Sequence, residues 1–293
     1  MRVSDGMLHD MAQRGIERAR EKTASASAAA STGLRVQKPS DDPVAHALAR
    51  RESARESTAR SSERTAEHGL SLTAGAEGAL AGVTDALSRA RELGVQLANG
   101  TFTAEDRAAA AHEIRELRKE VTSFANTEVE GVHVFAGYRD AAPPFDEVTG
   151  AYSGDGAVRR LEVAPHLRFP VGVSGATTFG AGTGTDVLAT LDAMATALET
   201  NDVAGVRTSL GGLDASATQI LDARAELGSQ MRAFEGARSA AQIAQDRGAA
   251  TRAQLVDVDP YRAFSELANA ERALEASVAV AARLPFAGLL GAR

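Results

Sequence analysis

The chain has 293 residues, of which 44% are apolar and only 4% aromatic. Its formal net charge is −7, which does not favour a nucleic-acid partner. Cysteine is absent, so disulfides, thiolate metal sites and cysteine nucleophiles are excluded. Because much of the apolar content is alanine, which buries little area per residue, we expect long, thin helical packing.

The start of the chain and its longest apolar run bear on export and membranes. Residues Met1–Asp10 show no basic stretch followed by an apolar run of signal-peptide length. The longest strongly apolar stretch, Ala276–Ala282, is far shorter than the ~20 residues that a membrane-spanning helix needs. We therefore expect no cleaved signal peptide and no membrane partner.

Residues 1–40 are expected to hold a first helix. No proline occurs between Val3 and Ser31, and Leu8, Met11 and Ile16 recur at helical spacing. Gly33 closes this element, because glycine tolerates the left-handed conformation common after a helix end.

Residues 41–130 form the first half of a helical body. Asp42 suits a helix cap and Pro43 the first helical position. Thr103 and Asp106 have the spacing of a capping box for a further helix. Between them, apolar residues at alternating steps of three and four predict a coiled-coil seam. We call this buried face the body seam, and here it contains Leu80, Val83, Leu87, Leu93 and Leu97.

Residues 131–185 have a different character and predict a small β-rich insert. Glycine and proline punctuate this stretch. Short strands are expected at His133–Phe135, Arg160–Val163 and Phe169–Val171.

Helix returns over residues 186–256, the second half of the body, and residues 257–293 carry a last helix that begins after Pro260. The body seam continues here with Leu210, Leu213, Ile220, Leu227 and Met231. The first and last helices have no obvious partner nearby in the sequence, so they are expected to pair with each other. The predicted fold is mainly α: a long antiparallel coiled coil or helical bundle formed by both chain ends, with a small β-rich central insert.

No pattern for chemistry stands out. The six histidines include no pair at helical ligand spacing, and Gly180, Gly182 and Gly184 lack the lysine of a phosphate-binding loop. No nucleophile, base and oxyanion donor can be assembled. We therefore predict no catalytic, cofactor-binding or metal-binding residues, and a protein that is not an enzyme.

Several segments resemble a known family. Ser31–Val36, Ala76–Leu80 and Arg89–Thr101 are similar to flagellins and their relatives. Four further features resemble the hook-associated junction proteins of this flagellin-like family. They are Met1–Ser4, Lys38–Val44, the entry into the insert (Ala125–Thr127, Gly131, Phe135–Tyr138 and Pro144–Phe145) and Val256–Ala281. The alanine-rich first helix and the tail Leu284–Arg293 depart from the family pattern.

The resemblance implies a structural subunit of the bacterial flagellum that forms the junction between hook and filament by polymerising. It implies an extracellular place, reached by type III export with a chaperone, and as partners the chain itself, a hook-side junction protein and flagellin. Ser40, Asp41, Asp42 and Pro43 match the family turn. The residues expected to pack in the axial core are Leu8, Met11, Ile16, Phe264, Leu267, Leu274, Val278 and Ala281.

Two alternatives remain open, a flagellin-type filament subunit and a coiled-coil adaptor. In addition, alanine-rich seams bury too little area to offset chain entropy of about 1–2 kcal/mol per residue. We therefore expect residues 1 to about 35 and about 260 to 293 to be disordered in the free monomer and to fold on assembly.

Overall fold

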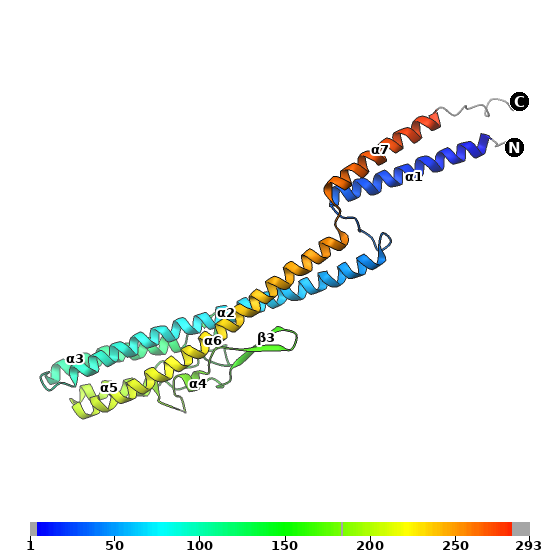
Figure 1. Cartoon of the computed structure of the whole chain (residues 1–293). Coiled ribbons are helices and arrows are strands. Elements are labelled where there is room, and N and C mark those ends of the chain that lie inside the picture. Colours follow the sequence, from blue (N-terminus) through cyan, green and yellow to red (C-terminus); the bar gives the residue numbers. More distant parts are fainter. Residues whose placement is uncertain (1–4, 183, 283–293) are drawn as a thin grey trace. The chain divides into compact units, whose positions relative to one another are not determined.

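The computed structural model describes residues 5–182 and 184–282, and Figure 1 shows that helices dominate them. Within these ranges there are seven helices and two antiparallel two-stranded sheets. This confirms the predicted fold class. The chain divides into two compact units, Met1–Ser57 with Ala244–Arg293, and Thr58–Ile243.

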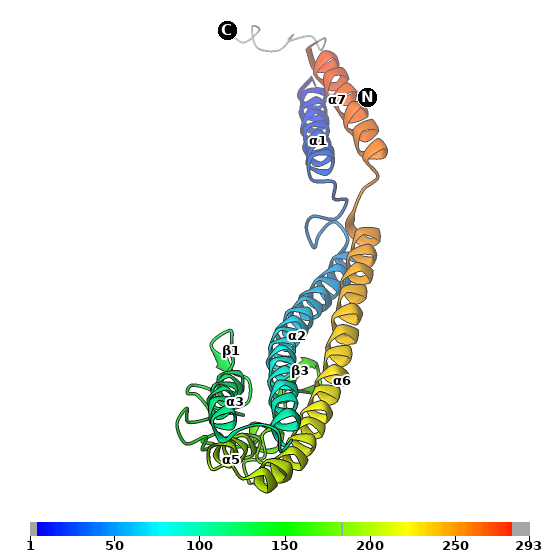
Figure 2. The same ribbon diagram turned by 90° about the vertical axis from the view of Figure 1, so that its left-hand side faces the viewer.

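The first unit contains a pair of antiparallel helices from the two chain ends. Helix α1 (Asp5–Thr32) and helix α7 (Pro260–Ala282) lie side by side in Figures 1 and 2. The amide of Val258, just before α7, donates to the carbonyl of Gly33, just after α1 (2.9 Å), so α7 begins where α1 ends. Further along, the Thr23 hydroxyl donates to the Ala270 carbonyl (3.2 Å). Gly33 has φ of +72°, the left-handed conformation expected at this helix end.

The first unit also holds the beginning of α2 (Pro43–Leu97) and the end of α6 (Val203–Val256). A small apolar cluster joins them, consisting of Val36, Ala45, Ala49 and Val256. On α2, buried Glu56 pairs with Arg252 of α6 at 3.2 Å. Alanine and valine make up this cluster, so its apolar area is modest.

In the second unit, the remaining parts of α2 and α6 run antiparallel. Arg91 pairs with Asp214 (2.6 Å) and Glu77 with Arg224 (2.6 Å), and Gly69 lies against the ring of Phe234. As the residue number rises along α2, it falls along α6. Gly69 and Gly94 have no Cβ atom, and a Cβ at either would meet Phe234 or Met194 well inside van der Waals distance, so these glycines permit close packing.

Two shorter helices complete the body. Helix α3 (Ala104–Ala125) begins with the predicted capping box, in which Thr103 and Asp106 each accept the other's backbone amide. Helix α5 (Val187–Glu199) is capped by Asp186 and packs against α3. Side chains from all four helices share one core with the insert, including Leu87, Ile114, Leu191 and Leu213.

The insert has strands at the three predicted places and one further short strand. Strand β1 (Glu128–Val129) pairs with β2 (Val132–His133), and β3 (Arg159–Ala164) pairs with β4 (Leu167–Val171), both antiparallel. Strand β1 begins before residue 131, and β2 ends at His133 instead of Phe135. Phe135 is fully buried and packs edge-on to Phe179 at 5.3 Å, so aromatic packing takes over from strand pairing there. A one-turn helix, α4 (Gly175–Thr178), follows.

Candidate self-association surface

The pair formed by α1 and α7 buries few of its apolar side chains and exposes several large ones. Met11, Phe264 and Val278 are 65%, 61% and 46% exposed. The remaining predicted axial residues with described side chains are half-buried, namely Ile16, Leu267, Leu274 and Ala281. The side chain of Leu8 and the tail Leu284–Arg293 lie outside the described residues.

The fully buried residues show how thin this pair is. Among the described side chains of α1 and α7, only Ala19 and Ala263 are buried. Two methyl groups supply a small fraction of the apolar area that a stable helix pair needs. The exposed apolar side chains of the pair are therefore available to a neighbouring molecule.

The family turn is a hydrogen-bonded loop between α1 and α2. The Asp41 carboxylate accepts the amides of Gln37 and Lys38, both at 2.9 Å, and the Asp42 carboxylate accepts the amide of Ala45 at 2.9 Å. Asp42 therefore caps α2 and Pro43 opens it, as the sequence predicts. These amides hold the pKa of each carboxyl below its usual value, that of Asp41 mainly through Lys38 and that of Asp42 mainly through Ala45. Ser40 and Pro43 are exposed.

Arg35 ties this turn to the end of α6. Its amide donates to the Val256 carbonyl (2.7 Å), its guanidinium donates to the Leu255 carbonyl (2.8 Å), and the guanidinium also lies 3.5 Å from Asp42. The turn is thus anchored by backbone groups and by charge. The sequence offered no periodic signal for this role of Arg35.

The body seam lies in the second unit. Most of its predicted members are buried, and these are Leu80, Val83, Leu87, Leu93, Leu97, Leu213, Ile220 and Leu227. Leu210 and Met231 are half-buried. The seam therefore belongs to the core of this unit, whereas the exposed axial residues lie on α1 and α7.

Two buried arginines on α3 were missed by the sequence reasoning. Arg107 donates to the carbonyls of Leu97 (3.0 Å) and Asn99 (2.9 Å) at the end of α2, where a cation also suits the helix dipole. Arg118 donates to the carbonyls of Glu147 (2.7 Å) and Val148 (3.1 Å) in the insert and lies 3.2 Å from Asp192 of α5. Both lie on the buried face of α3, which also contains Ala111, Ile114, Val121 and Ala125. These six positions follow one another at steps of four and three, and this spacing could have revealed that the two arginines are buried.

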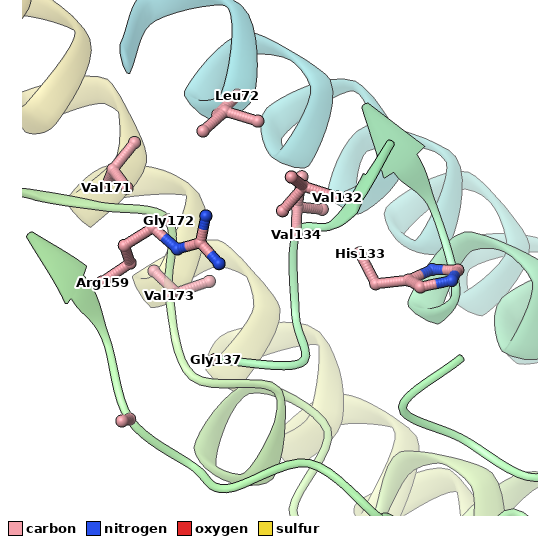
Figure 3. Close-up of a pocket in the computed structure, with 10 residues that line it drawn as sticks. Leu72, Val132, His133, Val134, Gly137, Arg159, Val171, Gly172 and Val173 are labelled. Carbon is pink, nitrogen blue, oxygen red and sulfur yellow. The ribbon is translucent and has the colours of Figure 1, made fainter. Parts of the chain in front are cut away.

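Figure 3 shows a small cavity where the insert meets α2. Leu72, Val134 and Val173 are among its lining residues, and the guanidinium of Arg159, which pairs with Asp140, reaches toward it. Its volume is about 20 Å³. Ligand pockets hold about 300–1,000 Å³, so this cavity has room for about one water molecule.

The described part of the chain shows neither a metal-binding group nor a membrane-spanning helix. No three histidine, aspartate or glutamate side chains converge there in a metal-binding group. None of the helices described is long and apolar enough to cross a membrane.

Comparison with known proteins places the chain among flagellar axial proteins. Residues 3–140 match the family described as the bacterial flagellin N-terminal helical region. The chain is 30% identical to flagellar hook-associated protein 3 of Salmonella typhimurium and 31% identical to that of Escherichia coli, over 94% of this chain and 95% of each relative. The chain therefore belongs to the flagellar hook-associated protein 3 family.

The chain is also similar to a more distant relative and to a solved structure. A flagellar filament 30.7 kDa core protein of Treponema maltophilum is 25% identical over 86% of this chain and 85% of the relative. The solved structure of a flagellar hook-associated protein from Vibrio parahaemolyticus, described there as putative, covers 74% of this chain and all of that one, with a TM-score of 0.68 and 23% identity. This structural likeness supports the fold.

Proposed function

We infer that this chain is a structural subunit of the bacterial flagellum that forms the junction between hook and filament by polymerising. The observation that carries this inference is the match to hook-associated protein 3 along almost the full length of both chains. The exposed apolar side chains of α1 and α7 fit a subunit that is completed by its neighbours. The role is structural and not catalytic.

The partners follow from that position. The chain contacts further copies of itself, a hook-side junction protein on one side and flagellin on the other. It reaches the outside of the cell through the flagellar type III export channel, and a cytoplasmic chaperone holds it before export. Neither nucleic acid nor membrane lipid is a partner.

Assembly also completes the fold of the chain ends. The α1–α7 pair buries only alanines among its described side chains, so it gains little from pairing alone. In the proposed mechanism, residues 5 to about 35 and about 260 to 282 become ordered when neighbouring subunits cover their apolar side chains. The axial packing then rests on the half-buried and exposed residues of α1 and α7 described above.

Deletion of the gene tests the proposed function. The deletion strain is expected to build hooks without filaments and to release flagellin into the medium, and a plasmid copy of the wild-type gene is expected to restore filaments. Electron microscopy and immunoblots of the medium give the readout. Filaments of normal length on the deletion strain would overturn the proposal.

A filament subunit is the second candidate, because the Treponema relative is a filament core protein that matches most of this chain. The two candidates predict different locations. Gold-labelled antibody against this chain marks a single point above the hook if the chain is a junction subunit. It marks the whole filament if the chain is a flagellin-type subunit.

A further inference from the structure

One face of the α1–α7 pair carries an open groove of about 540 Å³. Five of its ten lining residues have short side chains, namely Ser25, Ala26 and Ala29 from α1 and Ala270 and Ala273 from α7. These side chains are too small to fill the space between the two helices. The groove is therefore large enough to accept a bulky side chain from outside.

A bulky side chain of matching character lies on the opposite face of α7. Phe264 is 61% exposed. With about 100° of rotation per residue, Phe264 lies roughly 120–180° round the helix from each α7 position that lines the groove. Phe264 therefore cannot reach the groove of its own chain, but it can reach the groove of another copy.

The charges on the two faces are complementary. Lys22, Arg35 and Glu266 are the charged residues among those that line the groove. Arg35 is already paired with Asp42 at 3.5 Å and Glu266 with Arg262 at 2.8 Å, which leaves the charge of Lys22 to be matched. The exposed Glu271 and Glu275 follow Phe264 by seven and eleven positions, which places them within about 20° of it on the helix. Lys22 of one copy would therefore meet a carboxylate of the next.

We propose that Phe264 of one copy inserts into the groove of a neighbouring copy, with Lys22 of that neighbour facing Glu271 or Glu275. This contact rests on the proposed polymerisation and specifies one interface within it. Because the two complementary surfaces lie on different faces, the contact is heterologous: each copy gives Phe264 to one neighbour and accepts it from another. Such contacts build rings or open helical assemblies and not two-fold dimers.

Cysteine cross-linking tests the contact directly, because the chain has no cysteine of its own. Two full-length double variants, Lys22→Cys/Glu271→Cys and Lys22→Cys/Glu275→Cys, keep Phe264, and all three of the substituted positions are exposed. Treated at high concentration with a mild oxidant, at least one of them is expected to form a ladder of disulfide-linked dimers, trimers and longer chains. The matched control is Lys22→Cys/Val148→Cys, which also keeps Phe264 and whose second site is 84% exposed and lies in the other unit. Its expected product is monomer.

Sedimentation of the wild-type chain under the same conditions distinguishes a failure of the Phe264 contact from a failure of the proposed function. Polymers of the wild type without a ladder above the control would overturn the Phe264 contact and leave the proposed function standing. Monomeric wild type without a ladder would overturn both.

A mixing experiment tests whether the contact is heterologous. Phe264→Ala removes the inserted ring and Ala273→Trp fills the groove from an exposed position, so each variant alone is expected to assemble about tenfold more weakly or worse. An equimolar mixture is expected to give dimers and nothing longer, because the ring of one variant still fits the open groove of the other. Assembly of either variant as strong as that of the wild type, or a mixture that remains monomeric, would overturn the proposal.

Discussion

Arg118 is a cation with very little contact with solvent. It is 7% exposed, and its guanidinium satisfies two carbonyls of the insert as well as the carboxylate of Asp192. Those carbonyls belong to Glu147 and Val148, which are far along the chain from α3. A single side chain thus holds a loop of the insert on the helical body.

Replacing Arg118 by methionine keeps most of its apolar stem and removes every donor. The carbonyls of Glu147 and Val148 then lose their partners, so unfolding in urea should show a loss of about 1–3 kcal/mol. The neighbouring Lys119 is exposed and pairs with Glu116 on the surface, so Lys119→Met should change stability by no more than about 0.5 kcal/mol. Equal effects of the two variants would show that Arg118 does not hold the insert.

Asp41 makes the family turn sensitive to acid. Its folded pKa is lowered, mainly by the amides of Lys38 and Gln37, from an ordinary value of about 3.9. A lowered carboxyl pKa contributes stability above the unfolded pKa, and this contribution disappears as the pH falls through the folded pKa. The amide signals of Gln37 and Lys38 in NMR spectra should therefore shift with a midpoint below pH 4. In Asp41→Asn that titration should be absent, and its persistence would mean that another group controls the turn.

At the scale of the element, α2 carries half of the residues that define the body seam. Leu87 is 2% exposed in the core, whereas Val95 on the same helix is 54% exposed. Leu87→Asp buries an unpaired carboxyl and should destabilise the body by several kcal/mol, as measured by thermal unfolding. Val95→Asp is the matched control and should melt close to the wild type. An unchanged melting temperature for Leu87→Asp would show that the seam does not stabilise the body.

The long helices could be predicted because their signals are local. The steps of three and four that include Leu80, Val83 and Leu87 identify the buried face without knowledge of the partner, and the caps at Asp42 and Thr103 fix the helix starts. Local residues therefore indicate where α2 and α3 begin and which face of α2 is buried.

The insert could not be predicted to the same level, because contacts distant in sequence define it. Phe135, Phe145 and Phe179 come from separate segments and meet edge to face, with Phe145 and Phe179 at 5.1 Å. Their packing decides where β2 ends. Which of the glycine-rich turns brings them together is not encoded in any short window, and neither is the reach of Arg118 from α3.

At the scale of the whole molecule, the chain ends and the body differ in how much they bury. The body seam contains many fully buried leucines, whereas the described side chains of α1 and α7 bury only Ala19 and Ala263. Backbone ordering costs about 1–2 kcal/mol per residue, and two alanines cannot offset that cost over helices of 28 and 23 residues.

Amide hydrogen exchange in the dilute monomer and in the polymer measures this difference between the chain ends and the body. In a dilute monomer, residues 5–32 and 260–282 should exchange at close to unfolded rates, while residues 80–97 and 206–227 in the seam stay protected by several orders of magnitude. In the polymer both sets should be protected, because neighbouring copies then cover Met11, Phe264 and Val278. The seam serves as the internal control, since it is buried within one chain and should not respond to concentration. Strong protection of the terminal helices in the dilute monomer would mean that they stabilise each other without neighbours, and that folding of the ends is not coupled to assembly.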